Sequence, residues 1–215
     1  MKAHGAAASM ALVLAAAAGL YSPPSFADRR ELYVQLEPGL ALQYLKDAPT
    51  QTSTAIGTGF GGQLSVFYGV TNGLHVGSYG RGFYAPDIAF ASVSPALADG
   101  SRSTGTLYEN AFGFGFGALV RWRFDTGYAF APLVQVELGM SWARFTNLQL
   151  VPTGRDFALQ LPPVDVLSSD GRIVVGGEYR IGEHFVISLL VGGRRSLNAL
   201  AHWQFDAAGA LAFVW

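Results

Sequence analysis

Residues 107–124 read LYENAFGFGFGALVRWRF, and large apolar side chains alternate with small or charged ones along this stretch. One set of alternate positions holds Tyr108, Phe112, Phe114, Phe116, Val120, Trp122 and Phe124. The other set holds Glu109, Gly113, Gly115, Gly117, Arg121 and Arg123. Because successive side chains of a strand point to opposite faces, this period of two predicts a strand with one apolar and one polar face.

The same alternation recurs along most of the chain. It predicts further strands over residues 31–45, 57–70, 74–85, 128–145, 171–181, 184–194 and 201–215. The connections alternate in length, with expected long loops at 46–56, 86–104 and 146–170 and tight turns at 71–73, 125–127 and 182–183. This order predicts an up-and-down antiparallel arrangement of eight strands.

The composition indicates whether such a sheet belongs to a soluble domain or to a membrane protein. Charged residues make up 13% of the chain, about half of the ~25% usual in soluble domains, whereas hydrophobic residues make up 50%. Beyond the N-terminal region, no apolar run is long enough for a spanning helix. A closed barrel is the other structure that pairs every backbone group inside a bilayer. The fold class expected is therefore all-β, a transmembrane eight-stranded antiparallel up-and-down β-barrel.

The N-terminal region predicts export. Lys2, the apolar run at 10–20 and a small-x-small site at 25–27 are typical of a signal peptide. We expect cleavage after Ala27, which gives a signal peptide at 1–27 and a barrel domain at 28–215. The absence of cysteine excludes disulfides and cysteine zinc sites. A net charge of −1 gives no indication of a nucleic-acid partner.

Aromatic residues favour a membrane barrel over a lipocalin-like soluble barrel, whose apolar face would point inward. All four tryptophans fall on the apolar parity, near the predicted strand ends. Two girdles of aromatic side chains are typical of outer-membrane barrels. The lower girdle is expected to hold Trp122, Trp215, Tyr68, Tyr128 and Tyr179, and the upper one Trp142, Trp203, Tyr44, Tyr84 and Tyr108.

With these features the chain resembles the small eight-stranded bacterial outer-membrane proteins, the class of the OmpA membrane domain, OmpX and OmpW-like barrels. The C-terminal residues Leu211, Phe213 and Trp215 resemble the terminal assembly signal of that class, with tryptophan where phenylalanine is commoner. The resemblance implies residence in the outer membrane after export through the periplasm. The implied partners are outer-membrane lipids, lipopolysaccharide and, during biogenesis, the barrel-assembly machinery.

The polar parity places many charges inside the predicted barrel. A buried charge must be paired, so we expect a luminal ion-pair network. Its expected members are Glu37, Arg81, Glu109, Arg121, Arg123, Glu137, Glu178, Arg180 and Asp206. Pairing is expected between neighbouring strands: Arg121 and Arg123 with Glu137, and Arg81 with Glu109. Such a network either plugs the lumen or lines a narrow polar conduit.

No catalytic, metal or cofactor site is expected from the residues. The mature chain holds His75, His184 and His202; His75 and His184 lie beside predicted turns, where a solvated histidine is ordinary. His184 and Ser188 share a parity but lie about 13 Å apart along a strand, too far for a Ser–His hydrogen bond. The function expected is a non-enzymatic outer-membrane barrel that contributes to envelope integrity or surface interaction. The alternative is a narrow channel for small or apolar solutes.

Overall fold

The computed structural model describes residues 31–127, 130–196 and 203–215. The predicted signal peptide and its cleavage site lie outside these residues. No helix in the described part of the chain is long and apolar enough to cross a membrane. The strands are β1 (Leu32–Lys46), β2 (Thr54–Gly69), β3 (Leu74–Val93), β4 (Gly105–Arg123), β5 (Phe130–Pro152), β6 (Leu159–Gln160), β7 (Val164–Ile181), β8 (Phe185–Ser196) and β9 (Trp203–Val214).

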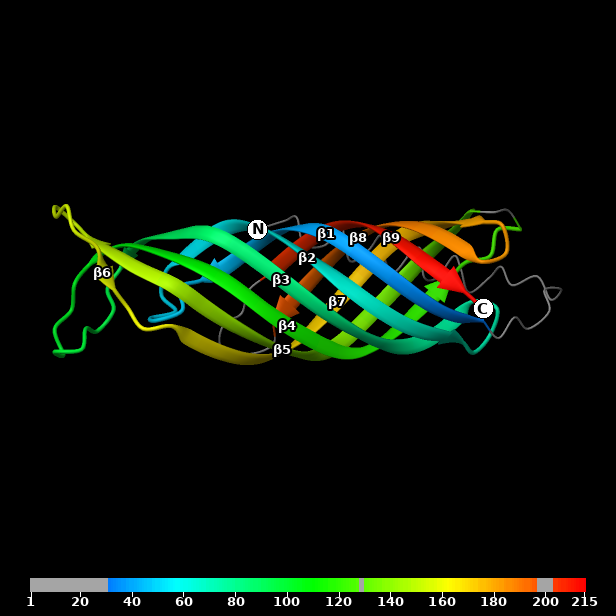
Figure 1. Ribbon diagram of the computed structural model, residues 1–215, viewed down its shortest axis with the longest axis horizontal. Helices are drawn as coiled ribbons and strands as arrows, with labels where there is room; N and C mark the ends of the chain where they lie inside the picture. Colours follow the sequence, from blue (N-terminus) through cyan, green and yellow to red (C-terminus); the bar gives the residue numbers. More distant parts are fainter. Residues whose placement is uncertain (1–30, 128–129, 197–202) are drawn as a thin grey trace, which may run out of the picture.

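Eight long strands close into a ring, and each pairs with antiparallel neighbours (Figure 1). The order is β1–β2–β3–β4–β5–β7–β8–β9, and β9 pairs back onto β1. A further short strand, β6, has two residues and pairs with the end of β5 outside the ring. The predicted all-β, eight-stranded up-and-down barrel is therefore confirmed.

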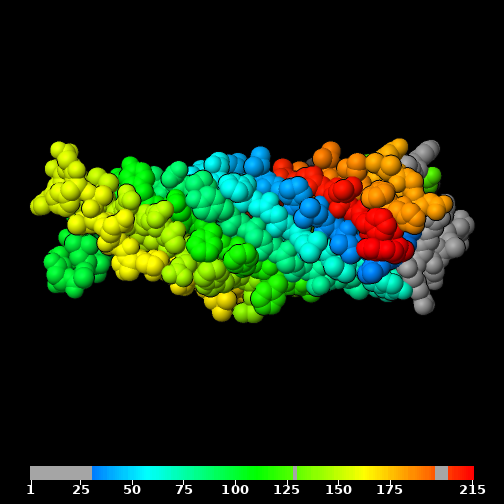
Figure 2. Space-filling view, viewed as in Figure 1, coloured from blue at the N-terminus to red at the C-terminus, as the bar shows by residue number. Residues whose placement is uncertain are grey.

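The two ends of the barrel differ. One end, here called the turn end, holds the connections at 70–73 and 182–184 together with C-terminal Trp215. The opposite loop end holds the connections at 47–53, 94–104 and 153–158. At the loop end the strands β3, β4 and β5 extend beyond β8 and β9, and the connections at 94–104 (green) and 153–158 (yellow) stand apart (Figures 1 and 2).

The side chains follow the predicted parity over most of the barrel. Leucine, valine and phenylalanine side chains face outward and are exposed, as in β8 with Phe185, Ile187, Leu189 and Val191. Glutamine, serine, glutamate and arginine side chains from the intervening positions are buried inside. A bilayer requires an apolar exterior around a polar interior. Soluble barrels have the reverse arrangement.

Three β-bulges interrupt this alternation toward the loop end. Asp87 (φ 50°) and Ser92 (φ 59°) are left-handed residues in β3, and Asn147 (φ 53°) is one in β5. The register shifts by one residue at each of these points. An extra residue reverses which positions face inward, so Ile88 and Phe90 enter the barrel although alternation from below the bulge would turn them outward.

The strands next to the loop end are longer than predicted, and two of them continue past the bulges. Residues 86–93 and 146–152 belong to β3 and β5, and 164–170 belong to β7, although all were expected to lie in the long loops at 86–104 and 146–170. The inward residues above the bulges form a loop-end cluster of apolar side chains. Its buried members are Leu45, Ala48, Ala85, Ile88, Phe90, Val93, Leu107, Ala111, Phe145, Leu148 and Leu150.

Candidate functional site

The middle of the barrel interior holds a connected set of charged side chains, here called the central network: Glu37, Arg81, Glu137, Asp170, Arg172, Arg194 and Asp206. Arg172 on β7 is its most connected member. Its Nη1 lies 3.0 Å from Oε1 of Glu137 on β5, and its Nη2 lies 2.7 Å from Oε1 of Glu37 on β1. The same Nη2 lies 2.6 Å from Oδ1 of Asp206 on β9. One guanidinium thus joins carboxylates from three other strands.

Arg194 on β8 extends the network. Its Nη2 lies 2.9 Å from Oε2 of Glu137, and its Nη1 lies 2.8 Å from Oδ1 of Asp170. The other oxygen of Asp170 lies 2.6 Å from Nη2 of Arg81 on β3. Because charge-assisted hydrogen bonds between buried groups are strong, this chain of contacts fixes β3, β5, β7 and β8 to one another through the lumen.

Some pairs join neighbouring strands, as Glu137 and Arg172 do on β5 and β7, whereas others cross the lumen. Asp170 on β7 reaches Arg81 on β3, with β4 and β5 between these strands in the ring. The interior of an eight-stranded barrel is just wide enough for side chains to fill it, so an arginine can reach the opposite wall. Glycine makes this possible at one point: a Cβ on Gly115 would lie 2.8 Å from Nε of Arg81.

A second set of polar contacts closes the turn end. Arg123 donates to Oε1 of Glu178 (3.2 Å) and to the hydroxyl of Tyr33 (3.0 Å). Arg180 and the Tyr33 hydroxyl both donate to Oε2 of Glu31, at 2.6 and 2.7 Å. Arg121 links this turn-end network to the central one: it lies 3.7 Å from Glu178, and its Nε donates to Gln135 (2.7 Å). Gln135 in turn donates to Glu137 (2.6 Å).

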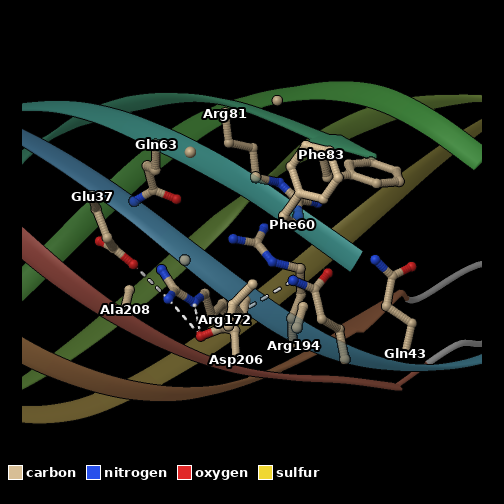
Figure 3. A pocket seen from close by; sticks show the side chains of 17 residues that line it. Glu37, Gln43, Phe60, Gln63, Arg81, Phe83, Arg172, Arg194, Asp206 and Ala208 are labelled. Carbon is tan, nitrogen blue, oxygen red and sulfur yellow. Dashed lines mark hydrogen bonds and ion pairs between the residues drawn. The ribbon is translucent and has the colours of Figure 1, made fainter. Parts of the chain in front are cut away.

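A small cavity opens beside the central network (Figure 3). It has a volume of about 50 Å³, and Glu37, Arg172, Asp206, Arg81 and Arg194 contribute to its lining. A buried water needs about 10–15 Å³ of such space, so the cavity has room for a few waters. Figure 3 shows Arg172 between Glu37 and Asp206, with dashed lines to both.

The expected partners of several luminal residues are wrong. Arg121 and Arg123 lie nearest to Glu178, at 3.7 and 3.2 Å, and not to Glu137. Arg81 pairs with Asp170 and not with Glu109. Glu109 opposes Ile88 above the first bulge, and six residues of strand, about 20 Å, separate it from Gly115, which opposes Arg81. Glu109 is buried at the edge of the loop-end cluster, without an ion-pair partner in the described part of the chain.

Arg172 and Arg194 are members of the central network that the expected set did not include, although both have the inward parity of their predicted strands. Asp170 is a third such member, and it was not expected to lie in a strand. It was placed in the loop at 146–170, whereas β7 begins at Val164. A sequence signal existed: Ser168, Asp170 and Arg172 continue the inward parity of the predicted strand at 171–181. Several inward glutamines were also missed as members. Gln63 and Gln135 both donate to Oε1 of Glu137, at 2.9 and 2.6 Å.

The aromatic residues named for the girdles face outward where the structure describes them. Tyr128 lies outside the described residues. The side chains exposed by more than a third are Trp122, Trp203, Trp215, Tyr44, Tyr68, Tyr108 and Tyr179, and those partly exposed are Tyr84 and Trp142. Leu211 and Trp215 are exposed on the same outer face, with Phe213 between them partly buried. The girdle and assembly roles stay predictions.

The histidines correct one expectation. His75 is buried in the lumen, in edge contact with the rings of Tyr33 and Phe67, although a solvated position was expected. His184 precedes β8 and is exposed; its ring stacks on Phe213 and its Nδ1 lies 3.1 Å from the carbonyl oxygen of Val214. His202 lies outside the described residues. No group of three or more metal-ligating side chains occurs within the described ranges.

Comparison with solved structures assigns the architecture. Neisserial surface protein A (NspA) has a TM-score of 0.55 and 12% sequence identity over 85% of this chain and 96% of that protein. This chain has the fold of a small eight-stranded outer-membrane β-barrel. Other outer-membrane barrels match with TM-scores of 0.43 and 0.45: Ail, the attachment invasion locus protein of Yersinia pestis, and OprG from Pseudomonas aeruginosa.

The coverage of these barrels is nearly complete, and the identity is low. Ail is 12% identical over 86% of this chain and 99% of its own, and OprG is 14% identical over 87% and 97%. No family model and no curated protein sequence matches this chain. At 12% identity, the similarity to NspA establishes the barrel fold alone.

Proposed function

We propose that this chain is a non-enzymatic barrel of the bacterial outer membrane, closed to solutes, that contributes to envelope integrity or surface interaction. The observation that carries the proposal is the cross-lumen network centred on Arg172, which joins Glu37, Glu137 and Asp206 where a channel would need open space. In this assignment the loop end faces outward from the cell and the turn end faces the periplasm, as in other such barrels.

Three layers support a closed lumen. The apolar loop-end cluster fills the interior above the central network, and the turn-end network fills it below. The central layer between them leaves a cavity of about 50 Å³, enough for a few waters and too small for a solute of several heavy atoms. An ion moving through the barrel would have to displace both the apolar cluster and paired charges, whose separation in a buried site is costly.

The test is single-molecule conductance of the refolded chain in a planar bilayer. We expect no steady conductance from the parent protein. Arg172→Ala, which leaves Glu37 and Asp206 without their shared partner, is expected to give flickering conductance or a large loss of stability. Arg144→Ala is the matched control, because Arg144 is half exposed on the outer wall and lies 3.9 Å from Asp165. Steady conductance of the parent protein would contradict the closed-barrel proposal and establish the channel alternative.

A further inference from the structure

An apolar groove lies on the outer wall where β1, β2 and β9 meet near the loop end. The side chains that form its surface are Leu42 and Tyr44 of β1, Ile56 of β2, and Trp203 and Phe205 of β9. Its volume is about 420 Å³. The register places these residues side by side, since Tyr44 pairs with both Ile56 and Trp203 and Leu42 pairs with Phe205.

Two aromatic rings form part of the floor of the groove. The rings of Trp203 and Phe205 are stacked, with an interplanar angle of 8° and centroids 6.5 Å apart. Ile56 and Phe205 are among the more exposed apolar side chains of the barrel, at 75% and 59%. A hollow between strands on the apolar outer wall provides a position in which one acyl chain can contact side chains from three strands.

Two cations lie beside this groove, Arg195 on its β8 flank and Lys46 toward the loop end. The guanidinium of Arg195 on β8 lies 4.9 Å from the ring centroid of Trp203, and Arg195 pairs with Trp203 in the sheet. Lys46 is two residues beyond Tyr44 on β1 and therefore shares its outward parity. Neither Arg195 nor Lys46 has an ion-pair partner within residues 31–127, 130–196 and 203–215.

We propose that this groove and these two cations form a binding site for one acylated, phosphorylated glycolipid of the outer leaflet, of the lipid A class. An acyl chain would lie against Leu42, Ile56 and Phe205, and a phosphate would lie between Arg195 and Lys46. The proposal rests on the proposed outer-membrane location, which turns this end of the wall toward the glycolipid leaflet. Charge complementarity selects an anionic head, because both cations lack a counter-charge from the described protein.

Arginine suits the assigned role better than lysine would. Its planar fork can present two parallel N–H groups to one phosphate while its face stays on the indole ring of Trp203. The stacking also restricts the side chain before the lipid binds, so less conformational entropy is lost on binding. Arg195 is thus held on the β8 flank of the apolar groove.

The test is lipid retention by the folded full chain, measured by native mass spectrometry after refolding in a neutral detergent. The probes are bisphosphorylated lipid A, the same lipid with its phosphates removed, and phosphatidylglycerol. We expect bisphosphorylated lipid A to bind at least tenfold more tightly than either of the others. Arg195→Gln is expected to lower its affinity about tenfold, which corresponds to one lost charge-assisted contact, and Lys46→Gln is expected to lower it less.

Arg144→Gln is the matched control, because Arg144 is also an outward arginine toward the loop end but lies on β5, away from the groove. An equal loss in this control would show diffuse attraction and overturn the site. Equal affinity for phosphatidylglycerol would overturn the glycolipid assignment, and absence of lipid A binding would overturn the proposal as a whole. In each case the circular dichroism and the conductance of the same samples report separately on the barrel and on its closed lumen.

Discussion

Glu137 and Arg172 form an ion pair in the barrel interior, with Oε1 and Nη1 3.0 Å apart and neither side chain more than 3% exposed. The same carboxylate also receives hydrogen bonds from Arg194, Gln63 and Gln135. A buried carboxylate is costly without partners, and this one has donors from β2, β7 and β8 and from Gln135 of its own strand, so its removal should affect the whole central network.

Glu137→Gln is therefore expected to lower the free energy of unfolding by about 3–5 kcal/mol, because Arg172 and Arg194 would lose the charge that they share. The measurement is urea-induced unfolding of the refolded protein in lipid vesicles, followed by tryptophan fluorescence. Asp165→Asn is the control: its partner Arg144 is 3.9 Å away and both are about half exposed, so the change should stay below about 1 kcal/mol. A loss for Glu137→Gln no larger than that of the control would mean that Glu137 is solvated.

Asp170 and Arg81 should be energetically coupled across the lumen. In a double-mutant cycle, Asp170→Asn leaves the guanidinium of Arg81 without its carboxylate, and Arg81→Met then removes that unpaired charge. We expect the double variant to be less destabilised than the sum of the single variants, by about 0.5–3 kcal/mol. The matched cycle of Arg81→Met with Glu109→Gln should be additive within about 0.5 kcal/mol. If Arg81 were coupled to Glu109 and not to Asp170, the measurement would support the pairing expected from the sequence and contradict the one in the structure.

The sequence was sufficient to predict the barrel and the sides of its wall, because alternation is a local property of each strand. Leu107 to Arg123 and Phe185 to Val191 face as their parity predicts. Glu137 and Arg172 lie opposite each other on neighbouring strands, so their pairing follows from the strand register alone. The partners that meet across the lumen could not be predicted, because no local pattern encodes that distance. Glu178 and Asp206, for example, were expected in the network, but their partners Arg123 and Arg172 follow only from the closed ring.

The upper parts of β3 and β5 were missed for a different reason. Ile88 and Phe90 have the same sequence parity as outward Tyr84, yet they face inward because the bulge adds one residue between them and Tyr84. Nothing in the composition of 86–93 marks Asp87 as the extra residue. Asparagine, aspartate and serine are tolerated at such left-handed positions, and they are equally common in turns.

Replacement of Asp87 should show whether its left-handed backbone sets the position of the loop-end cluster. At φ 50°, a β-branched residue is strained and glycine is not, so Asp87→Val is expected to cost about 1–2 kcal/mol more than Asp87→Gly. The measurement is again urea-induced unfolding in lipid vesicles, followed by tryptophan fluorescence. Ala89→Val, two residues along the strand and outward-facing, is the control for valine itself and should change stability by less than about 0.5 kcal/mol. Equal stability of the valine and glycine variants at position 87 would indicate that the bulge can move.

Trp215 extends the β1–β9 seam that closes the ring: its backbone N–H and carbonyl both pair with Leu32, at 3.1 and 3.2 Å, while its side chain is 62% exposed. An exposed indole contributes little to internal packing, so Trp215→Ala should leave the unfolding midpoint of the refolded protein nearly unchanged. If the side chain serves assembly, the same variant should reach the outer membrane at a clearly reduced level, measured by immunoblot of fractionated cells. Trp215→Phe retains an aromatic terminus and should restore the level.

Deletion of 213–215 also removes the backbone pairs of the closing strand and should leave the protein in the periplasm or degraded. Normal membrane levels of the alanine variant would contradict an assembly role, and an equal loss of stability after refolding would assign Trp215 to the folded barrel instead.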